Sequence, residues 1–141
     1  MELKDKIIVV TGAASGIGRA MAIRFKAEGA KQIVAVDINI EGAKATAEMI
    51  GGVAMSADVS KEEDIQRVIE DTENSIGPID LFCSNAGVGI GESINSSNKE
   101  WQMSWDINVM SHIYAARHLL PLMTARGSGY FLNTSSAAGL L

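Results

Sequence analysis

The sequence contains little cysteine, histidine and proline, and it has no excess of basic residues. Its 141 residues include one cysteine and two histidines, too few for an internal disulfide or for a metal cluster of the usual ligands. The single cysteine, Cys83, suits a reducing compartment, so we expect a cytoplasmic protein. The net charge of −5 and the lack of a basic patch disfavour nucleic acid and anionic membranes as partners.

Long hydrophobic runs are missing as well. No run is long enough to span a bilayer, and residues 1–6 lack the apolar core of a signal peptide. The composition, 47% hydrophobic and 21% charged, is that of an ordinary globular protein. We expect one domain over residues 1–141, because this length supports one hydrophobic core and falls short of two domains.

Short apolar runs alternate with amphipathic segments along the whole chain. The pattern predicts strands at 7–11, 32–36, 53–56, 79–83 and 130–134, and helices at 17–28, 40–50, 61–76 and 98–125. Strict alternation of strand and helix predicts a doubly wound parallel α/β sheet with right-handed crossovers. In such a sheet ligands bind at the carboxyl ends of the strands, near the point where the strand order reverses.

Local patterns predict the faces and ends of the helices. The first helix should bury one stripe, made of Ile17, Met21 and Phe25. Ser60 and Glu63 have the spacing of a capping box, so Ser60 is the predicted N-cap of the third helix. Pro121 should kink the last helix or end it early, because proline lacks the backbone N–H that the helix needs.

The glycine-rich stretch Thr11–Gly18, TGAASGIG, joins the first strand to the first helix. A helix N-terminus presents unpaired N–H groups and the positive end of the helix dipole, which together favour an anion such as a pyrophosphate. Glycine is needed at the closest approach, because any side chain would hold the phosphates away. The stretch therefore predicts a dinucleotide site, in which the pyrophosphate contacts Gly12, Ser15, Gly16, Ile17 and Gly18.

Asp37 ends the second strand, about 20 residues after the glycine-rich turn. A carboxylate there can accept hydrogen bonds from both hydroxyls of an adenosine ribose, and it would repel a 2′-phosphate. Ser15 is not basic and no Lys or Arg closely follows Asp37, so NAD is favoured over NADP. The alternative is that Asp37 only caps the next helix.

Three motifs resemble the N-terminal portion of the short-chain dehydrogenase/reductase family: the TGxxxGxG spacing, Asn85-Ala86-Gly87 after the fourth strand, where Ser84 replaces the family's first Asn, and residues 133–139, NTSSAAG, at the fifth strand. The resemblance implies a Rossmann-type sheet with strand order 3-2-1-4-5. It implies that Asp58 and Val59 contact the adenine, although an Asp at that place is otherwise an ordinary turn residue. It also implies that Asn85, Ala86 and Gly87 line the cofactor's ribose.

By the same resemblance, Ser136 and Asn108 belong to the catalytic set. Ser136 would hydrogen-bond the substrate oxygen and stabilise the charge that develops there. Asn108 would distort its helix and fix a water in the proton relay, although on its residue type alone it is an exposed helical position. The family's Tyr-x-x-x-Lys pair, which exchanges the proton during hydride transfer, does not occur up to Leu141.

We therefore expect the N-terminal part of an NAD-dependent enzyme that interconverts an alcohol and a ketone, incomplete at its C-terminus and inactive over these 141 residues alone. The resemblance implies a homo-oligomer, dimer or tetramer, at full length. The fifth strand should leave Phe131 and Leu132 exposed at a sheet edge. Two alternatives stay open: a non-catalytic dinucleotide-binding module or redox sensor, and a relative of the sugar-nucleotide epimerases, which typically show TGxxGxxG instead.

Overall fold

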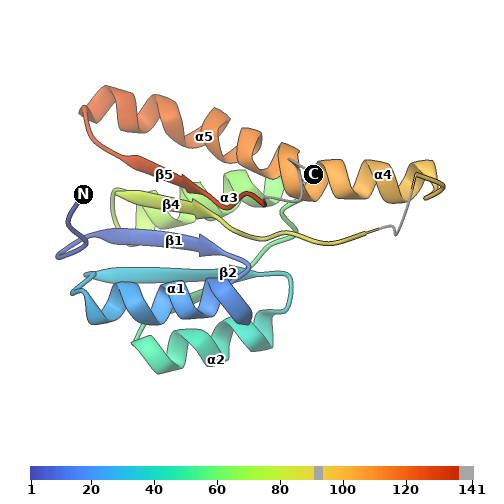
Figure 1. The fold of residues 1–141 in the computed structure, drawn as a ribbon. Helices are drawn as coiled ribbons and strands as arrows, with labels where there is room; N and C mark the ends of the chain where they lie inside the picture. The colour runs from blue at the N-terminus through green and yellow to red at the C-terminus, as the bar shows by residue number, and fades with distance from the viewer. Residues whose placement is uncertain (91–93, 137–141) are drawn as a thin grey trace.

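The computed structural model describes residues 1–90 and 94–136 (Figure 1). The elements follow in the order β1 (Ile7–Thr11), α1 (Gly16–Ala27), β2 (Gln32–Asp37), α2 (Ile40–Ile50), β3 (Val53–Ser56), α3 (Glu62–Ser75), β4 (Leu81–Ser84), α4 (Asn98–Trp105), the π-helical turn η1 (Asp106–Met110), α5 (Ser111–Arg126) and β5 (Tyr130–Asn133). Every predicted strand and helix is present, with ends shifted by a few residues.

The five strands form one parallel sheet in the order β3-β2-β1-β4-β5, which confirms the predicted strand order. The central strand β1 pairs with β2 on one side and β4 on the other, and all five of its residues are buried. Because β1 is covered on both faces, it is apolar at nearly every position instead of alternating. The order reverses between β1 and β4, so a ligand site is expected above that pair.

The sheet separates two hydrophobic cores, as the helices on its two sides show in Figure 1. Val9 and Phe82 point to the side covered by α3 and α5, where Ile65 and Leu119 complete the core. Residues that alternate with them, such as Ile8, point to the side of α1 and α2. Side chains two residues apart share a face of the sheet, which explains the division. The core thus fixes both helical layers against the strands.

One prediction about helix faces held in part and one about helix ends was wrong. Met21 and Phe25 of the predicted α1 stripe are partly buried against the core, but Ile17 is 66% exposed, and the fully buried residues of α1 are Gly18 and Ala22, because Gly18 packs against the backbone of the preceding turn. The N-cap of α3 is Lys61, since both the N–H and the hydroxyl of Ser60 donate to the carboxylate of Asp58. A capping box does occur at the start of α4, between Ser97 and Glu100.

The C-terminal elements differ from expectation at two places. Of the kink or early end expected at Pro121, the early end does not occur, because α5 continues through Pro121 to Arg126 and stops at Gly127, whose φ is 68°. On β5, Leu132 is 43% exposed as expected, but Phe131 packs against Phe82, with ring centroids 6.4 Å apart.

Over the described ranges, none of the helices has the length and apolarity needed to cross a membrane.

Candidate functional site

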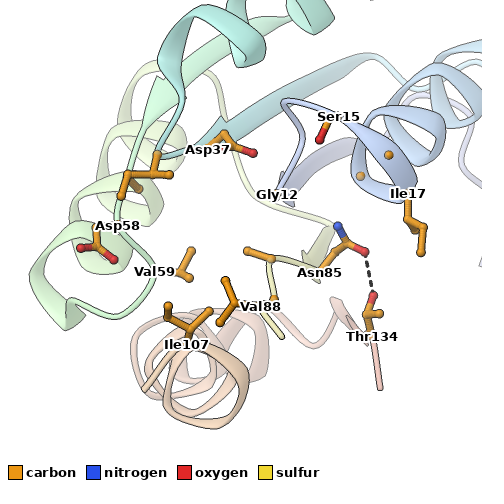
Figure 2. A pocket seen from close by; sticks show the side chains of 16 residues that line it. Gly12, Ser15, Ile17, Asp37, Asp58, Val59, Asn85, Val88, Ile107 and Thr134 are labelled. Carbon is orange, nitrogen blue, oxygen red and sulfur yellow. Dashed lines mark hydrogen bonds between the residues drawn. The ribbon is translucent and has the colours of Figure 1, made fainter. Parts of the chain in front are cut away.

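The carboxyl ends of the strands open into a pocket of about 590 Å³ (Figure 2). Every residue predicted to hold the cofactor lines this pocket: Gly12, Ser15, Gly16, Ile17, Gly18, Asp37, Asp58, Val59, Asn85, Ala86 and Gly87. Five further residues, not predicted from the sequence, also line the pocket: Ile38, Ala57, Val88, Ile107 and Thr134. The pocket lies above β1 and β4, where the strand order reverses.

The glycine-rich turn needs its glycines for two reasons. Gly12 and Gly16 have φ values of 69° and 51°, a region that side chains rarely adopt. A Cβ on Gly12 would lie 2.9 Å from the Cα of Ala86, and a Cβ on Gly18 would collide with the carbonyl of Gly12. The turn, the start of α1 and the loop after β4 therefore approach closely, and the side-chain amide of Asn85 lies beside both glycines.

The N-terminus of α1 faces the pocket through Ser15, Gly16, Ile17 and Gly18. Ser15 is the N-cap residue, yet its side chain makes no capping hydrogen bond. The first N–H groups of a helix have no partner inside the helix, and together with the helix dipole they favour an anion. This end of the pocket is suited to a phosphate group.

Asp37 is held at the pocket by two backbone donors. The N–H of Ala14 donates to Oδ2 of Asp37 at 2.9 Å, and the N–H of Asn39 donates to Oδ1 at 2.9 Å. The cap of α2 is Asn39, whose Oδ1 accepts from the N–H of Gly42 at 3.1 Å. Each carboxylate oxygen keeps acceptor capacity for a further donor such as a ribose hydroxyl.

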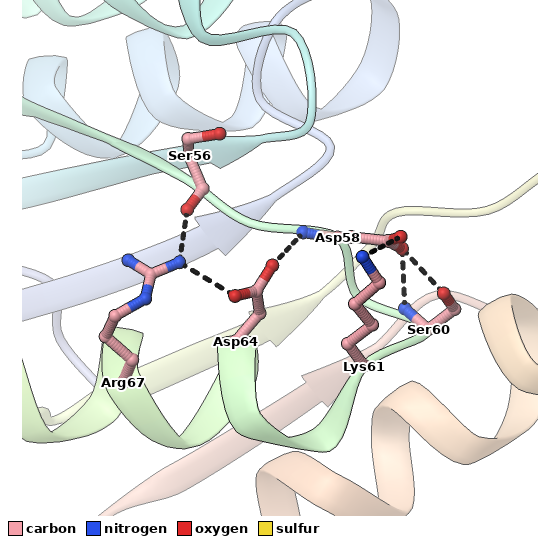
Figure 3. Close-up of polar contacts among 6 residues, drawn as sticks. All are labelled: Ser56, Asp58, Ser60, Lys61, Asp64 and Arg67. Carbon is pink, nitrogen blue, oxygen red and sulfur yellow. Dashed lines mark hydrogen bonds and ion pairs between the residues drawn. The ribbon is translucent and has the colours of Figure 1, made fainter.

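The turn after β3 is braced by a second polar network (Figure 3). Oδ1 of Asp58 accepts from the N–H and the hydroxyl of Ser60, at 3.1 and 2.7 Å. The N–H of Asp58 donates to Oδ2 of Asp64 at 2.8 Å, and Arg67 donates to Oδ1 of Asp64 and to the carbonyl of Ser56. The hydrogen bond from Asp58, followed by Arg67, lowers the pKa of Asp64. The carboxylate of Asp64 thus holds the turn, and Oδ2 of Asp58 has Lys61 at 3.7 Å.

Asn85 connects three strand ends below the pocket. Its Nδ2 donates to the carbonyl of Thr11 at 3.1 Å, and its Oδ1 accepts from the hydroxyl of Thr134 at 3.0 Å (Figure 2). The hydroxyl of Thr11 donates to the carbonyl of Cys83 and accepts from the N–H groups of Asn85 and Ala86. The ends of β1, β4 and β5 are therefore joined by one hydrogen-bonded chain.

Asn108 lies within η1, where the helix widens to a π-turn, so a local distortion occurs at the residue for which one was expected. Its Oδ1 accepts from the N–H of Val88 and its Nδ2 donates to the carbonyl of Val88, each at 2.9 Å. A further hydrogen bond joins Nδ2 to the hydroxyl of Ser104 at 3.1 Å. Asn108 does not line the pocket itself, but it fixes Val88, which does.

Ser136 lies beyond the end of β5 and is exposed. It is not among the residues that line the pocket, whereas Thr134 on the same segment is. Among the described residues, no group of three or more His, Cys, Asp and Glu is placed to hold a metal ion.

Comparison with known proteins identifies the chain. The family model described as short chain dehydrogenase matches residues 6–141. The chain belongs to the short-chain dehydrogenase family. A relative in Bacillus subtilis, the uncharacterized oxidoreductase YvrD, is 37% identical over 147 residues, which cover 99% of this chain and 54% of that protein.

Two solved structures share the fold of this short-chain dehydrogenase. A putative short-chain dehydrogenase/reductase from Burkholderia xenovorans has a TM-score of 0.88 and 29% identity, over 99% of this chain and 57% of that one. A protein from Brucella melitensis 16M, named ribose-5-phosphate isomerase, has a TM-score of 0.93 and 28% identity, over 99% of this chain and 55% of that one. The chain thus spans about half the length of the relatives it matches.

The pocket residues that were missed are mostly apolar neighbours of predicted ones. Ile38 follows Asp37, Ala57 precedes Asp58, and Val88 follows Gly87. Ile38 could have been found from the sequence, because it is a large apolar residue that follows a strand-end carboxylate and belongs to no buried stripe. In the structure its side chain is 69% exposed. Ile107 gave no such signal, since only the docking of η1 brings it to the pocket.

Proposed function

We propose that this short-chain dehydrogenase chain binds NAD and belongs to an oxidoreductase that interconverts an alcohol and a ketone by hydride transfer. One observation carries the proposal: the uncapped N-terminus of α1 and the carboxylate of Asp37 line the same pocket. A dinucleotide needs both features, because its diphosphate is an anion and its adenosine ribose presents two hydroxyl donors. The volume of about 590 Å³ falls in the range of cofactor pockets.

The charges around the pocket favour NAD over NADP. None of the residues described as lining the pocket is Lys or Arg. Arg19 lies behind the turn, where its guanidinium donates to the carbonyl of Ala14 and to the hydroxyl of Thr46. A 2′-phosphate would therefore meet the carboxylate of Asp37 with no lining cation to compensate it. The apolar side chains of Ile38 and Val59 also line the pocket, where they would pack against the adenine.

In the proposed reaction, the chain's own residues orient the partners of the hydride transfer. The nicotinamide ring, when bound, supplies the carbon that gives or takes the hydride. Asn108 holds the loop at Val88 through two hydrogen bonds and so fixes one wall of the pocket. Ser136 would donate a hydrogen bond to the substrate oxygen and stabilise its developing charge. The cytoplasmic location and the oligomer that the family resemblance implies belong to this proposal.

A second candidate, a dinucleotide-binding module without catalysis, is favoured by one observation: Ser136 does not line the pocket. The coding sequence after Leu141 separates the two. A Tyr-x-x-x-Lys pair shortly downstream would support the enzyme, because that pair supplies the proton exchange. A stop codon there would favour the binding module.

The cofactor proposal is tested with NADH and NADPH, whose binding is followed by fluorescence titration on wild type and on Asp37→Asn. We expect wild type to bind NADH more tightly than NADPH, by about tenfold or more. Asp37→Asn should lower or abolish this preference, because it removes the charge that repels the 2′-phosphate. The ratio is the decisive quantity, since a merely loosened turn would weaken both ligands alike.

Asp71→Asn is the matched control, because it removes the same charge from an exposed position on α3, away from the pocket. It should leave the ratio unchanged. A wild-type chain that binds neither ligand, or that prefers NADPH, would contradict the proposal.

A further inference from the structure

The backbone of Ala13 and Ala14, in the glycine-rich turn, has all four of its polar groups engaged. The N–H of Ala13 donates to the carbonyl of Val36 at 3.1 Å, and the N–H of Ala14 donates to Asp37 at 2.9 Å. The carbonyl of Ala13 accepts from the hydroxyl of Thr46 at 2.7 Å, and the carbonyl of Ala14 accepts from the guanidinium of Arg19. Strand pairing explains the first bond only, so the others depend on side chains.

Thr46 and Arg19 act together behind the turn. Thr46 is fully buried on α2, and its hydroxyl also accepts from Nε of Arg19 at 3.0 Å. The helix α2 reaches the turn through Gly42, where an added Cβ would lie 2.6 Å from the Cβ of Ala14. The two side chains therefore form a clamp between α1, α2 and the turn, on the side away from the pocket lining.

The rigid peptide group links this clamp to the pocket. In a trans peptide the C=O and the N–H point in opposite directions. The carbonyl of Ala13 turns to Thr46, and the N–H of the same peptide group turns to Asp37. The carbonyl of Ala14 turns to Arg19, so the N–H of Ser15, a lining residue, is directed the other way. Because the carbonyls of Ala13 and Ala14 are held, the directions of the N–H groups of Ala14 and Ser15 at the start of the anion site are held as well.

We propose that Thr46 and Arg19 are positioning residues for the diphosphate of the cofactor, an inference that rests on the proposed function. They do not contact the ligand. They hold the peptide groups of the turn so that its free N–H groups are aligned before the ligand binds, and the ligand is spared the cost of ordering them.

The chain offers a matched control for Thr46. Thr72 on α3 is equally buried, and its hydroxyl donates to the carbonyl of Val68 four residues earlier at 2.7 Å. The hydroxyl of Thr46 also lies 3.2 Å from the carbonyl of Gly42, four residues earlier, but this longer contact shares the single proton that is donated to the carbonyl of Ala13 at 2.7 Å. Only Thr46 is also bonded to the turn. Thr46→Val and Thr72→Val therefore make the same chemical change, and they differ only in the link to the turn.

The test compares two ligands, ADP-ribose by isothermal titration calorimetry and adenosine by ligand-observed NMR, on the same chain. Thr46→Val should weaken the binding of ADP-ribose about tenfold, the size expected for losing one buried hydrogen bond, and should change adenosine binding far less. Thr72→Val should change neither ligand. Thr46→Ser, which keeps the hydroxyl, should restore the binding of ADP-ribose.

Arg19→Lys keeps the positive charge but cannot reach both acceptors with a rigid fork, so it should reproduce the loss without unfolding the core. It keeps the proposal testable if Thr46→Val does not fold. Equal binding of ADP-ribose by wild type, Thr46→Val and Arg19→Lys would overturn the clamp. An equal loss for both ligands would overturn it too, because it would indicate general loosening. A wild type that fails to bind ADP-ribose would instead overturn the proposed function.

Discussion

The strands β1 and β5 are parallel members of one sheet, but their surroundings differ. All five residues of β1 are buried, whereas Tyr130 and Leu132 on β5 are 54% and 43% exposed. Their positions account for the difference, because within the described part of the chain β1 pairs on both sides and β5 pairs with β4 alone. The glycine-rich turn follows β1 and Ser136 follows β5. The turn proposed to bind the cofactor therefore follows a buried central strand, whereas the serine proposed for catalysis follows a partly exposed one.

The loops beyond these strands repeat the contrast. The turn after β1 has both carbonyls of Ala13 and Ala14 held by side chains from two helices. The segment after β5 is tied at Thr134, whose N–H donates to the carbonyl of Ser84 and whose hydroxyl donates to Asn85. The glycine-rich turn is thus held by α1 and α2, whereas Thr134 and Asn85, which also line the pocket, hold each other across the ends of β4 and β5.

The largest expected effect comes from a pair of phenylalanines that face each other across β4 and β5. Phe82 and Phe131 are register partners, but Phe82 is fully buried and Phe131 only partly. Phe82→Ala should lower the free energy of unfolding by about 3–5 kcal/mol. Phe131→Ala should lower it by about 1–2 kcal/mol, because much less apolar area is withdrawn from water there. Urea denaturation followed by circular dichroism measures both.

Tyr130→Ala is the control for β5, since its exposed side chain should contribute less than either phenylalanine. An equal loss of unfolding free energy in Phe82→Ala and Phe131→Ala would contradict the contrast between β1 and β5. It would show that β5 packs as firmly as the central strands.

The fold could be predicted because local signals and global topology agree. Apolar runs with glycine-rich turns and amphipathic segments between them predict a parallel sheet, and the residues that end each strand then share one edge. The predictions that failed were local. Ile17 has the spacing of the stripe in which Met21 and Phe25 do pack against the core, but at the start of α1 it is Gly18 that packs on the turn, and Ile17 is left exposed. Ser60 has the right residue type for an N-cap, but its hydroxyl donates a hydrogen bond to the carboxylate of Asp58 instead.

The candidate site was predicted where strand ends carry polar or glycine residues, and was missed where tertiary packing supplies a wall. Ile107 reaches the pocket only through the π-turn, which no spacing rule indicates. The clamp of Thr46 and Arg19 has no signature in sequence either, because a threonine and an arginine on different helices meet only after folding. Long-range hydrogen bonds of this kind are the part that a single sequence does not encode in a readable pattern.

A smaller effect should come from His112, a partly buried residue near the start of α5. Burial lowers the pKa of His112 below its ordinary 6.5, and the interaction with the side chain of Asn133 at the end of β5 opposes this. The unfolded chain then takes up the proton first, so stability is lost as the pH falls through 6.5. His112→Gln should flatten this part of the pH profile, measured as the urea midpoint from neutral to mildly acidic pH. An unchanged profile would show that β5 docks without burying the ring.

The smallest effect is expected at Ser84, at the carboxyl end of β4 beside β5. Ser84 is 3% exposed, and within the described residues its hydroxyl has no hydrogen-bond partner. Ser111 is 4% exposed, but its hydroxyl donates to the carbonyl of Ile107 at 2.7 Å. Ser84→Ala should therefore change the free energy of unfolding by less than about 0.5 kcal/mol or increase it, whereas Ser111→Ala should lower it by about 1 kcal/mol. A loss above about 1 kcal/mol at Ser84 would mean that its hydroxyl binds a buried water. The contact between β4 and β5 would then be stabilised by a buried water, and the end of β5 would resemble the well hydrogen-bonded end of β1.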